Sequence, residues 1–85
     1  MVIPKGVVEI QYNSFRDCAG LREVVFEAGS VLKKIGDWAF YGCMSLRNIQ
    51  LPDGLETIGI RCFKHSGLEE AILPKSVKSI EPDAF

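Results

Sequence analysis

Apolar residues recur along this chain in fixed columns, at spacings too long for one helix or one hairpin. Phenylalanine occupies positions 15, 40, 63 and 85, and isoleucine occupies positions 10, 35, 58 and 80, both at intervals of 25, 23 and 22 residues. The leucines at 21, 46 and 68 keep the same register, as do Phe26, Leu51 and Leu73. Self-similarity at such a period predicts a repeat architecture in which successive units stack on one another.

Each repeat contains two short extended segments. Residues 46–51 end in apolar–polar alternation, which predicts a short strand with Ile49 and Leu51 facing inward. Pro52 and Gly54 then predict a turn, and residues 55–58 a second short extended piece. The polar and apolar positions therefore predict two strands per repeat.

A compact corner follows the second strand. At residues 36–40 and 81–85, Gly or Asp near the start and a proline at an early position predict a single helical turn. No segment keeps a 3.6-residue period long enough for a full helix. Tetratricopeptide, ankyrin and HEAT arrays are therefore excluded by both period and pattern.

These columns resemble the BspA-like class of leucine-rich repeat, over essentially the whole chain. The matching residues are Ile35-Gly36, Ala39-Phe40, Cys43, Leu46, Ile49, Leu51, Pro52, Ile58-Gly59, Phe63 and Leu68. The resemblance implies a right-handed leucine-rich-repeat solenoid of short parallel β-strands with short helical or 3-10 corners. We expect one domain over residues 1–85, with repeats at approximately 3–26, 27–51, 52–73 and 74–85.

The two ends of the chain fall inside the repeat pattern. The sequence opens at Ile3-Pro4, part-way through a repeat, and stops at Ala84-Phe85, where the pattern would continue toward another strand. We expect either a fragment of a longer array or a protein whose apolar ends pack against another copy or another subunit.

Composition and charge exclude several classes of protein. The 85 residues are 47% hydrophobic, which is too apolar for a disordered chain. Ten Lys and Arg balance eleven Asp and Glu, so there is no basic excess to attract nucleic acid. No apolar run is long enough for membrane insertion, and the N-terminal residues do not have the pattern of a signal peptide.

Two exposed strips are candidates for binding a protein partner. The outward positions of the first strand in each repeat are predicted to be Glu23, Val25, Asn48, Gln50, Glu70 and Ile72. The second strip runs over the corners, where Trp38 should lie one repeat from Arg61 and stack on it, with Tyr41 nearby. Trp, Tyr and Arg together are typical of binding hot spots. The alternatives are an ordinary solvated sheet face and a Trp38 that shields Phe40.

The three cysteines and the single histidine are the candidates for a metal site or a catalytic nucleophile. Cys18, Cys43, Cys62 and His65 have the composition of a Cys3His zinc site. The repeat register places Cys18 and Cys43 in one column and Cys62 in another, so buried free thiols are favoured, and no metal or other cofactor is implied. His65 lacks a placed third residue to orient it, and no glycine-rich phosphate loop is present, so an enzyme is not expected.

The resemblance implies a non-catalytic protein-interaction module. In that family such arrays lie at the cell surface or outside the cell and act in adhesion. The alternative is a structural spacer or a self-assembling subunit, in which the uncapped ends of the solenoid pack against other copies or subunits.

Overall fold

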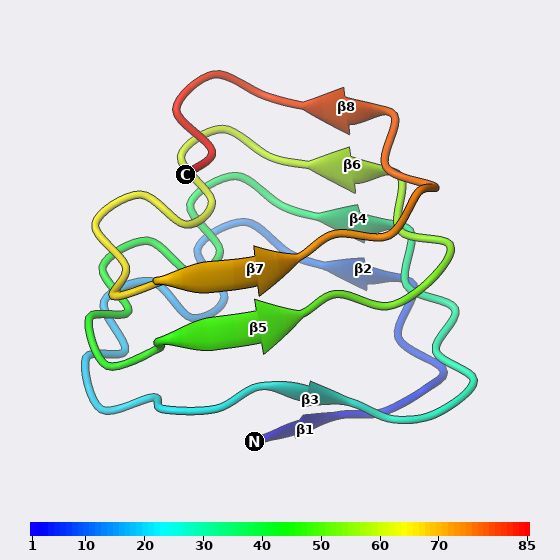
Figure 1. Cartoon of the computed structure of the whole chain (residues 1–85), viewed down its shortest axis with the longest axis horizontal. Helices are drawn as coiled ribbons and strands as arrows, with labels where there is room; N and C mark the ends of the chain where they lie inside the picture. The colour runs from blue at the N-terminus through cyan, green and yellow to red at the C-terminus, as the bar shows by residue number, and fades with distance from the viewer.

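The computed structural model describes residues 1–85 as a stack of short parallel strands with no helix. Here each repeat is counted from its front strand rather than from residues 3, 27, 52 and 74, so that it contributes one front strand and then one back strand (Figure 1). The front strands are β1 (Val2–Ile3), β3 (Val25–Phe26), β5 (Asn48–Gln50) and β7 (Glu70–Ile72). The back strands are β2 (Glu9–Ile10), β4 (Lys34–Ile35), β6 (Thr57–Ile58) and β8 (Ser79–Ile80).

The back strands form one continuous sheet in the order β2-β4-β6-β8. Its register pairs Ile10 with Ile35, Ile35 with Ile58, and Ile58 with Ile80. The isoleucines that recur at intervals of 25, 23 and 22 residues in the sequence therefore lie beside one another in the structure. The predicted solenoid is confirmed, and the first repeat carries a front strand, β1, as the later ones do.

The front strands do not form one continuous sheet. β1 pairs with β3 and β5 pairs with β7, but β3 and β5 are not hydrogen-bonded to each other. Figure 1 shows β1 and β3 lying apart from β5 and β7. Strand pairing is thus continuous along the back of the solenoid and interrupted between β3 and β5 along its front.

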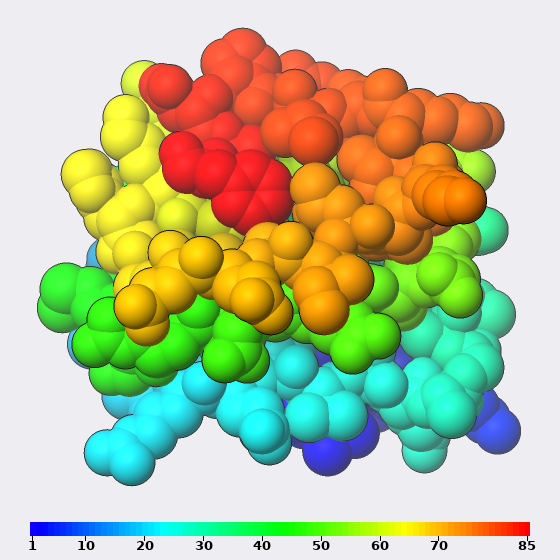
Figure 2. Space-filling view, in the orientation of Figure 1, coloured from blue at the N-terminus to red at the C-terminus, as the bar shows by residue number.

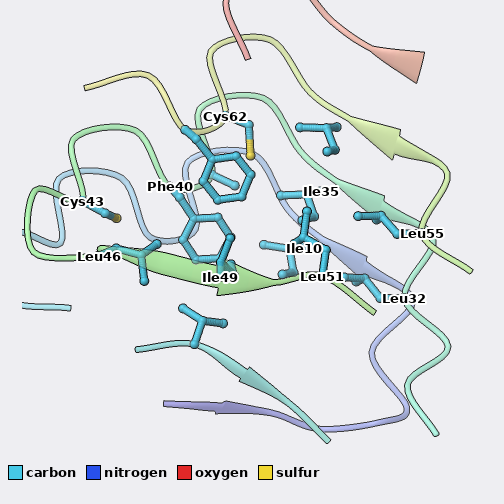
Figure 3. Packing of buried hydrophobic residues seen from close by; sticks show 14 of the residues in the cluster. Ile10, Leu32, Ile35, Phe40, Cys43, Leu46, Ile49, Leu51, Leu55 and Cys62 are labelled. Carbon is cyan, nitrogen blue, oxygen red and sulfur yellow. The ribbon is translucent and has the colours of Figure 1, made fainter. Parts of the chain in front are cut away.

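The core lies between the front and back layers and is entirely apolar. Sixteen buried residues form one cluster, and no polar or charged residue is buried (Figure 3). The aligned phenylalanines stack ring on ring, with centroids 5.3 Å apart for Phe15–Phe40 and Phe40–Phe63, and 5.1 Å apart for Phe63–Phe85. No single repeat is thick enough to cover these side chains, so each repeat is stabilised by its neighbours.

The predicted helical corners are wrong. Each corner is a series of tight turns, and in the first turn of each corner the third residue has positive φ, as in a type II turn. Trp38 in the turn from Gly36 to Ala39 has φ 63°, and Arg61 in the turn from Gly59 to Cys62 has φ 52°. The N–H groups of Ala39 and Cys62 donate to the residues three positions earlier, Gly36 and Gly59.

Stacking explains why these corners are not helical. The N–H groups of Trp38, Phe40 and Gly42 donate to carbonyls of the next repeat, at N···O distances of 2.9, 2.9 and 3.0 Å. The intervening N–H groups close local turns. A helical corner would direct all of these donors along its own chain and leave the next repeat unbonded. Hydrogen bonding between repeats therefore prevails over local helix formation.

Two glycines allow the back corners to approach one another closely. A Cβ at Gly36 would lie 2.6 Å from the backbone nitrogen of Tyr12, and a Cβ at Gly59 would lie 2.6 Å from that of Asp37. Neither glycine has positive φ, so space rather than backbone conformation requires glycine here. This explains the Ile-Gly pairs of the sequence pattern.

Candidate functional site

The six candidate residues of the front face are all exposed. Asn48 and Gln50 of β5 lie directly opposite Glu70 and Ile72 of β7, as the repeat register predicts. Ile72 retains 51% of its surface, although it is a large apolar side chain. These four residues form one continuous surface over the β5–β7 sheet.

Glu23 and Val25 lie on the other side of the break in the front layer. Val25 belongs to β3, is 44% exposed and pairs with Val2 of β1 rather than with Gln50. The predicted column of Val25, Gln50 and Ile72 is therefore interrupted between the second and third repeats. The structure brings the six residues to one face but not into one unbroken sheet.

A groove of about 610 Å³ separates β3 from β5, and we call it the β3–β5 groove. In Figure 2 it lies between the cyan atoms of the second repeat and the green atoms of the third. Four of the predicted front residues line it: Glu23, Val25, Asn48 and Gln50. Glu27 and Asp53 also line it and were not predicted, because they follow the strands and belong to loops.

One cause of the groove is an extra residue before each of the strands β3 and β5. Cys18 to Leu21 and Cys43 to Leu46 span one residue more than the equivalent Ser66 to Leu68. In the shorter segment the N–H of Gly67 donates to the carbonyl of Cys43 at 3.0 Å, and a Cβ there would clash with the carbonyl of Met44. No equivalent bond reaches from the third repeat to the second, so β7 is held onto β5 while β5 is not held onto β3.

The loops beyond the strands are also bonded away from each other. Glu27 Oε1 accepts a hydrogen bond from the backbone N–H of Lys5 at 2.8 Å, which holds the second repeat's loop to the first repeat. The N–H of Gly54 donates to Ser76 Oγ at 3.0 Å, which holds the third repeat's loop to the fourth. The groove therefore lies between a loop that is hydrogen-bonded to the first repeat and a loop that is hydrogen-bonded to the fourth repeat.

The corner residues form a separate cluster. The guanidinium of Arg61 lies 5.1 Å from the Trp38 ring centroid, so the predicted stacking is confirmed. Arg16 lies 4.5 Å from the same ring and 5.1 Å from the Tyr41 ring, and the two rings are 4.7 Å apart. We call Arg16, Trp38, Tyr41 and Arg61 the Trp38 cluster. Arg16 occupies the position one repeat before Tyr41, and its stacking on Trp38 was not predicted.

Charged side chains and His65 surround the Trp38 cluster. Asp83 Oδ2 lies 3.6 Å from Arg61 Nε and 3.5 Å from Lys64 Nζ. His65 meets the Tyr41 ring edge-on at 5.3 Å. Trp38 is half-buried, and its positive φ is a strained conformation for a bulky side chain. Two flanking guanidinium groups offset that strain by stacking.

The three cysteines differ in exposure, and the prediction of three buried thiols is wrong for Cys18. Cys18 is exposed, whereas Cys43 and Cys62 are buried. The Cys43 thiol donates to the carbonyl of Phe15 at 3.1 Å, and burial raises its pKa to about 11. Burial also raises the pKa of the Cys62 thiol to about 12. Both buried thiols stay protonated and poorly nucleophilic near neutral pH.

The structure contains no group of three or more His, Cys, Asp or Glu side chains arranged to hold a metal ion. His65 instead packs against Tyr41. The structure also contains no helix of the length and apolar character that crosses a bilayer.

Parallel strands that stack in register around an apolar core, with one exposed strand face, define a leucine-rich-repeat solenoid. Residues 1–85 match the family described as "BspA type Leucine rich repeat region (6 copies)", and the chain belongs to this family. No curated protein and no solved structure gives a significant match to the chain. Membership supports a repeat module of the protein-interaction type, since leucine-rich repeats typically mediate contacts between proteins.

Proposed function

We propose that this chain is a non-catalytic module that binds a protein partner through the front face of the solenoid, in the manner of a surface adhesin. The observation that carries the proposal is the β3–β5 groove of about 610 Å³, which four of the six predicted front residues line. Binding sites in proteins are concave and combine apolar walls with a few polar groups. Ile72 and Val25 supply exposed apolar surface beside Asn48 and Gln50.

The Trp38 cluster is a second candidate surface of the same module. Its residue types are those that dominate binding energy at interfaces. It lies on the corners that follow the back strands, whereas the groove lies among the front strands, so the two surfaces are separate. Most of the Trp38 surface is already covered by its own neighbours, which favours the front face as the main contact.

The test uses binders selected against the immobilised chain from a displayed library of protein segments. Gln50→Arg combined with Ile72→Arg should weaken the selected binders about tenfold or more, because two bulky charges then stand on the β5–β7 face. The control exchanges the charges of the exposed, paired residues of the back sheet, as Glu9→Lys with Lys34→Glu. If the selected binders are weakened only by the control variant, or only by Trp38→Ala, the proposal that the front face is the binding surface is wrong.

A self-assembling or spacer role is the second candidate function. Large apolar residues are exposed in the last repeat at Ile80 and Phe85 and in the first repeat at Val2 and Val8, each to between 50% and 61%. Such surfaces on a solenoid can be covered by another copy. Light scattering over a concentration series tests this role: the mass should rise with concentration for the wild type and stay monomeric for Ile80→Asp with Phe85→Asp. A wild-type chain that stays monomeric at high concentration would exclude self-assembly.

A further inference from the structure

Cys18 and Cys43 occupy the same position in neighbouring repeats. They lie 25 residues apart, which is the first interval of the phenylalanine column. The third repeat has Ser66 at this position, and Cys62 belongs to another column. Figure 3 shows the side chain of Cys62 apart from that of Cys43. The interface between the first and second repeats is therefore the one that carries a thiol on each side.

The main chain brings these two positions close together. The N–H of Asp17 donates to the carbonyl of Tyr41 at 2.7 Å. A Cβ on Gly42 would lie 3.4 Å from the Asp17 Cα, so the Cα atoms of Asp17 and Gly42 lie within about 5 Å of each other. Asp17 and Gly42 directly precede the two cysteines, and the register of the stack carries this spacing on to them. Disulfides usually join Cα atoms that are about 4.4–6.8 Å apart.

The Cys43 thiol is directed at the main chain around Cys18. The carbonyl oxygen of Phe15 accepts hydrogen bonds from the Cys43 thiol at 3.1 Å and from the Cys18 N–H at 3.2 Å, so one oxygen atom contacts both cysteines. Burial raises the pKa of Cys43 to about 11, the Cys18 N–H lowers it, and the Cys18 thiol raises it. The two cysteines therefore interact, and rotation of the exposed Cys18 side chain can bring its sulfur to that of Cys43.

The first repeat contributes little to the core. Among residues 1–20 only Ile3 and Ile10 are buried, whereas the second and third repeats supply most of the buried cluster. Its corner is held to the second repeat by hydrogen bonds from the N–H groups of Asn13, Phe15 and Asp17. Segments with few buried apolar contacts open before the rest of a protein does. A covalent bond at the end of this corner therefore acts where the solenoid is held least firmly.

We propose that Cys18 and Cys43 form a reversible disulfide that holds the corner of the first repeat to the second when the chain meets a disulfide oxidant such as oxidised glutathione. The proposal goes beyond the proposed function and does not depend on it. The bond restricts the unfolded chain between residues 18 and 43, which stabilises the folded state. Disulfides persist outside the cell and are reduced in the cytosol, so the bond is expected to form outside the cell and to open in the cytosol.

The bond forms by two successive thiol–disulfide exchange reactions. The thiolate of Cys18, which is exposed, attacks one sulfur of oxidised glutathione, whose S–S bond breaks to release the first glutathione. Cys43 then loses its proton and attacks the Cys18 sulfur, which releases the second glutathione. The two released thiolates take up the two protons that the cysteines lose. Two cysteine thiols are thereby oxidised, and one glutathione disulfide is reduced.

The first test identifies the thiols that the oxidant consumes. The 85-residue chain is equilibrated in dilute solution with oxidised glutathione at mildly alkaline pH, then unfolded, alkylated and mapped by mass spectrometry. The chain should lose the mass of two hydrogen atoms, a cross-linked peptide should join Cys18 to Cys43, and Cys62 alone should be alkylated. Cys62→Ala should oxidise in the same way, and Cys18→Ser should give no cross-link.

The second test measures whether the bond holds the first repeat in place. The amides of Phe15 and Asp17, which donate to the second repeat, should exchange about tenfold or more slowly in the oxidised chain than in the reduced chain. The amide of Phe63, which donates to the last repeat, should change by less than about threefold. Cys18→Ser, treated with the same oxidant, should show no change at any of these amides.

The remaining outcomes overturn the proposal. A chain that ends as a glutathione adduct of Cys18, or as a dimer joined through Cys18, would show that Cys43 is out of reach. A disulfide that includes Cys62 would show that the chain opens before it is oxidised. Equal exchange in the oxidised and reduced chains would show that the bond does not hold the first repeat. Each of these results leaves binding at the front face untouched, so the proposed function is tested separately.

Discussion

The back and the front of this solenoid are built from the same repeats but are joined differently. The back layer pairs four strands in one sheet, and the corners beside it are bonded across every interface between repeats. The front layer pairs its strands two by two and leaves a groove of about 610 Å³ between β3 and β5. Repeats whose buried residues align in register can therefore still differ in strand pairing, because the length of the loops decides which neighbouring strands come close enough to form hydrogen bonds.

Loss of the Phe40 ring should destabilise the front and back layers together, and we expect it to have the largest effect on stability. Phe40 is fully buried and its ring lies between those of Phe15 and Phe63. Phe40→Ala should lower the free energy of unfolding by about 3–5 kcal/mol, as measured by urea denaturation. Phe85→Ala is the control, because Phe85 is 52% exposed and touches a ring on one side only. An equal loss from both variants would show that the stacked column does not carry the stability.

Alkaline pH should lower the stability of the folded chain through the buried Cys62 thiol, which lies in a corner that follows a back strand. Its pKa in the folded chain is about 12, against a reference value of 9.0, because burial disfavours the thiolate. The folded state then holds its proton above pH 9 while the unfolded chain releases one, so stability is complete below pH 9 and falls as pH rises toward 12. The slope approaches about 1.4 kcal/mol per pH unit. In Cys62→Ala the decline above pH 9 should be shallower than in the wild type; identical slopes would contradict this.

A methyl group at Gly59 should separate the back corners. A Cβ there would lie 2.6 Å from the backbone nitrogen of Asp37 and also meets the Asp37 carboxylate. Gly59→Ala should cost about 1–3 kcal/mol of stability, as overpacking does. Gly20→Ala is the matched control, because nothing lies within 4 Å of its added Cβ. A thermal melt in which both variants behave alike would contradict the close approach.

A methyl group at Gly67 should separate β7 from β5, so that this pair resembles the unpaired strands β3 and β5. Its Cβ would clash with the Met44 carbonyl, so β7 should move away from β5. Gly67→Ala should speed hydrogen exchange at the Leu51 and Glu69 amides, which donate to Ile72 and Arg47 across the two repeats. The Gly59 amide, which donates to Ile35 in the back layer, should be affected less. Uniform acceleration would mean that the two layers do not open separately.

Substitutions at Trp38 should have the smallest effect on folding and should separate strain from stacking. Trp38→Ala removes the stacking of Arg16 and Arg61 but keeps a side chain at φ 63°. Trp38→Gly removes the stacking and the strain together, so it should be more stable than Trp38→Ala by about 1 kcal/mol. Chemical denaturation of both variants measures the difference. A less stable glycine variant would show that positive φ is not costly here.

The solenoid and the contents of its core could be predicted from the sequence. The columns of Ile35 and Phe40 repeat because each position must cover the one below it, and this constraint is visible as a period. The corners could not be predicted, because local propensity at Gly36-Asp37-Trp38 favours a helical turn. The donors of Trp38 and Phe40 are instead taken by the next repeat, which no local pattern reveals.

The candidate site could be predicted only in part. The outward positions Asn48 and Gln50 follow from alternation, and stacking of Arg61 on Trp38 follows from register. The β3–β5 groove was missed, although its cause is visible as one fewer residue before Leu68 than before Leu46. A difference in loop length shows that neighbouring repeats cannot bond alike, but only the structure shows which pair separates.

Hydrogen exchange of individual amides tests the difference between front and back most directly. The Gly59 amide, bonded to Ile35 in the back layer, and the Leu51 amide, bonded to Ile72 in the front layer, should exchange slowly. The amides of Phe26, Asn48 and Gln50, which face the groove, should exchange at nearly the rate of an unfolded chain. If these three exchange as slowly as Leu51, then β3 and β5 are paired and the groove does not exist in solution.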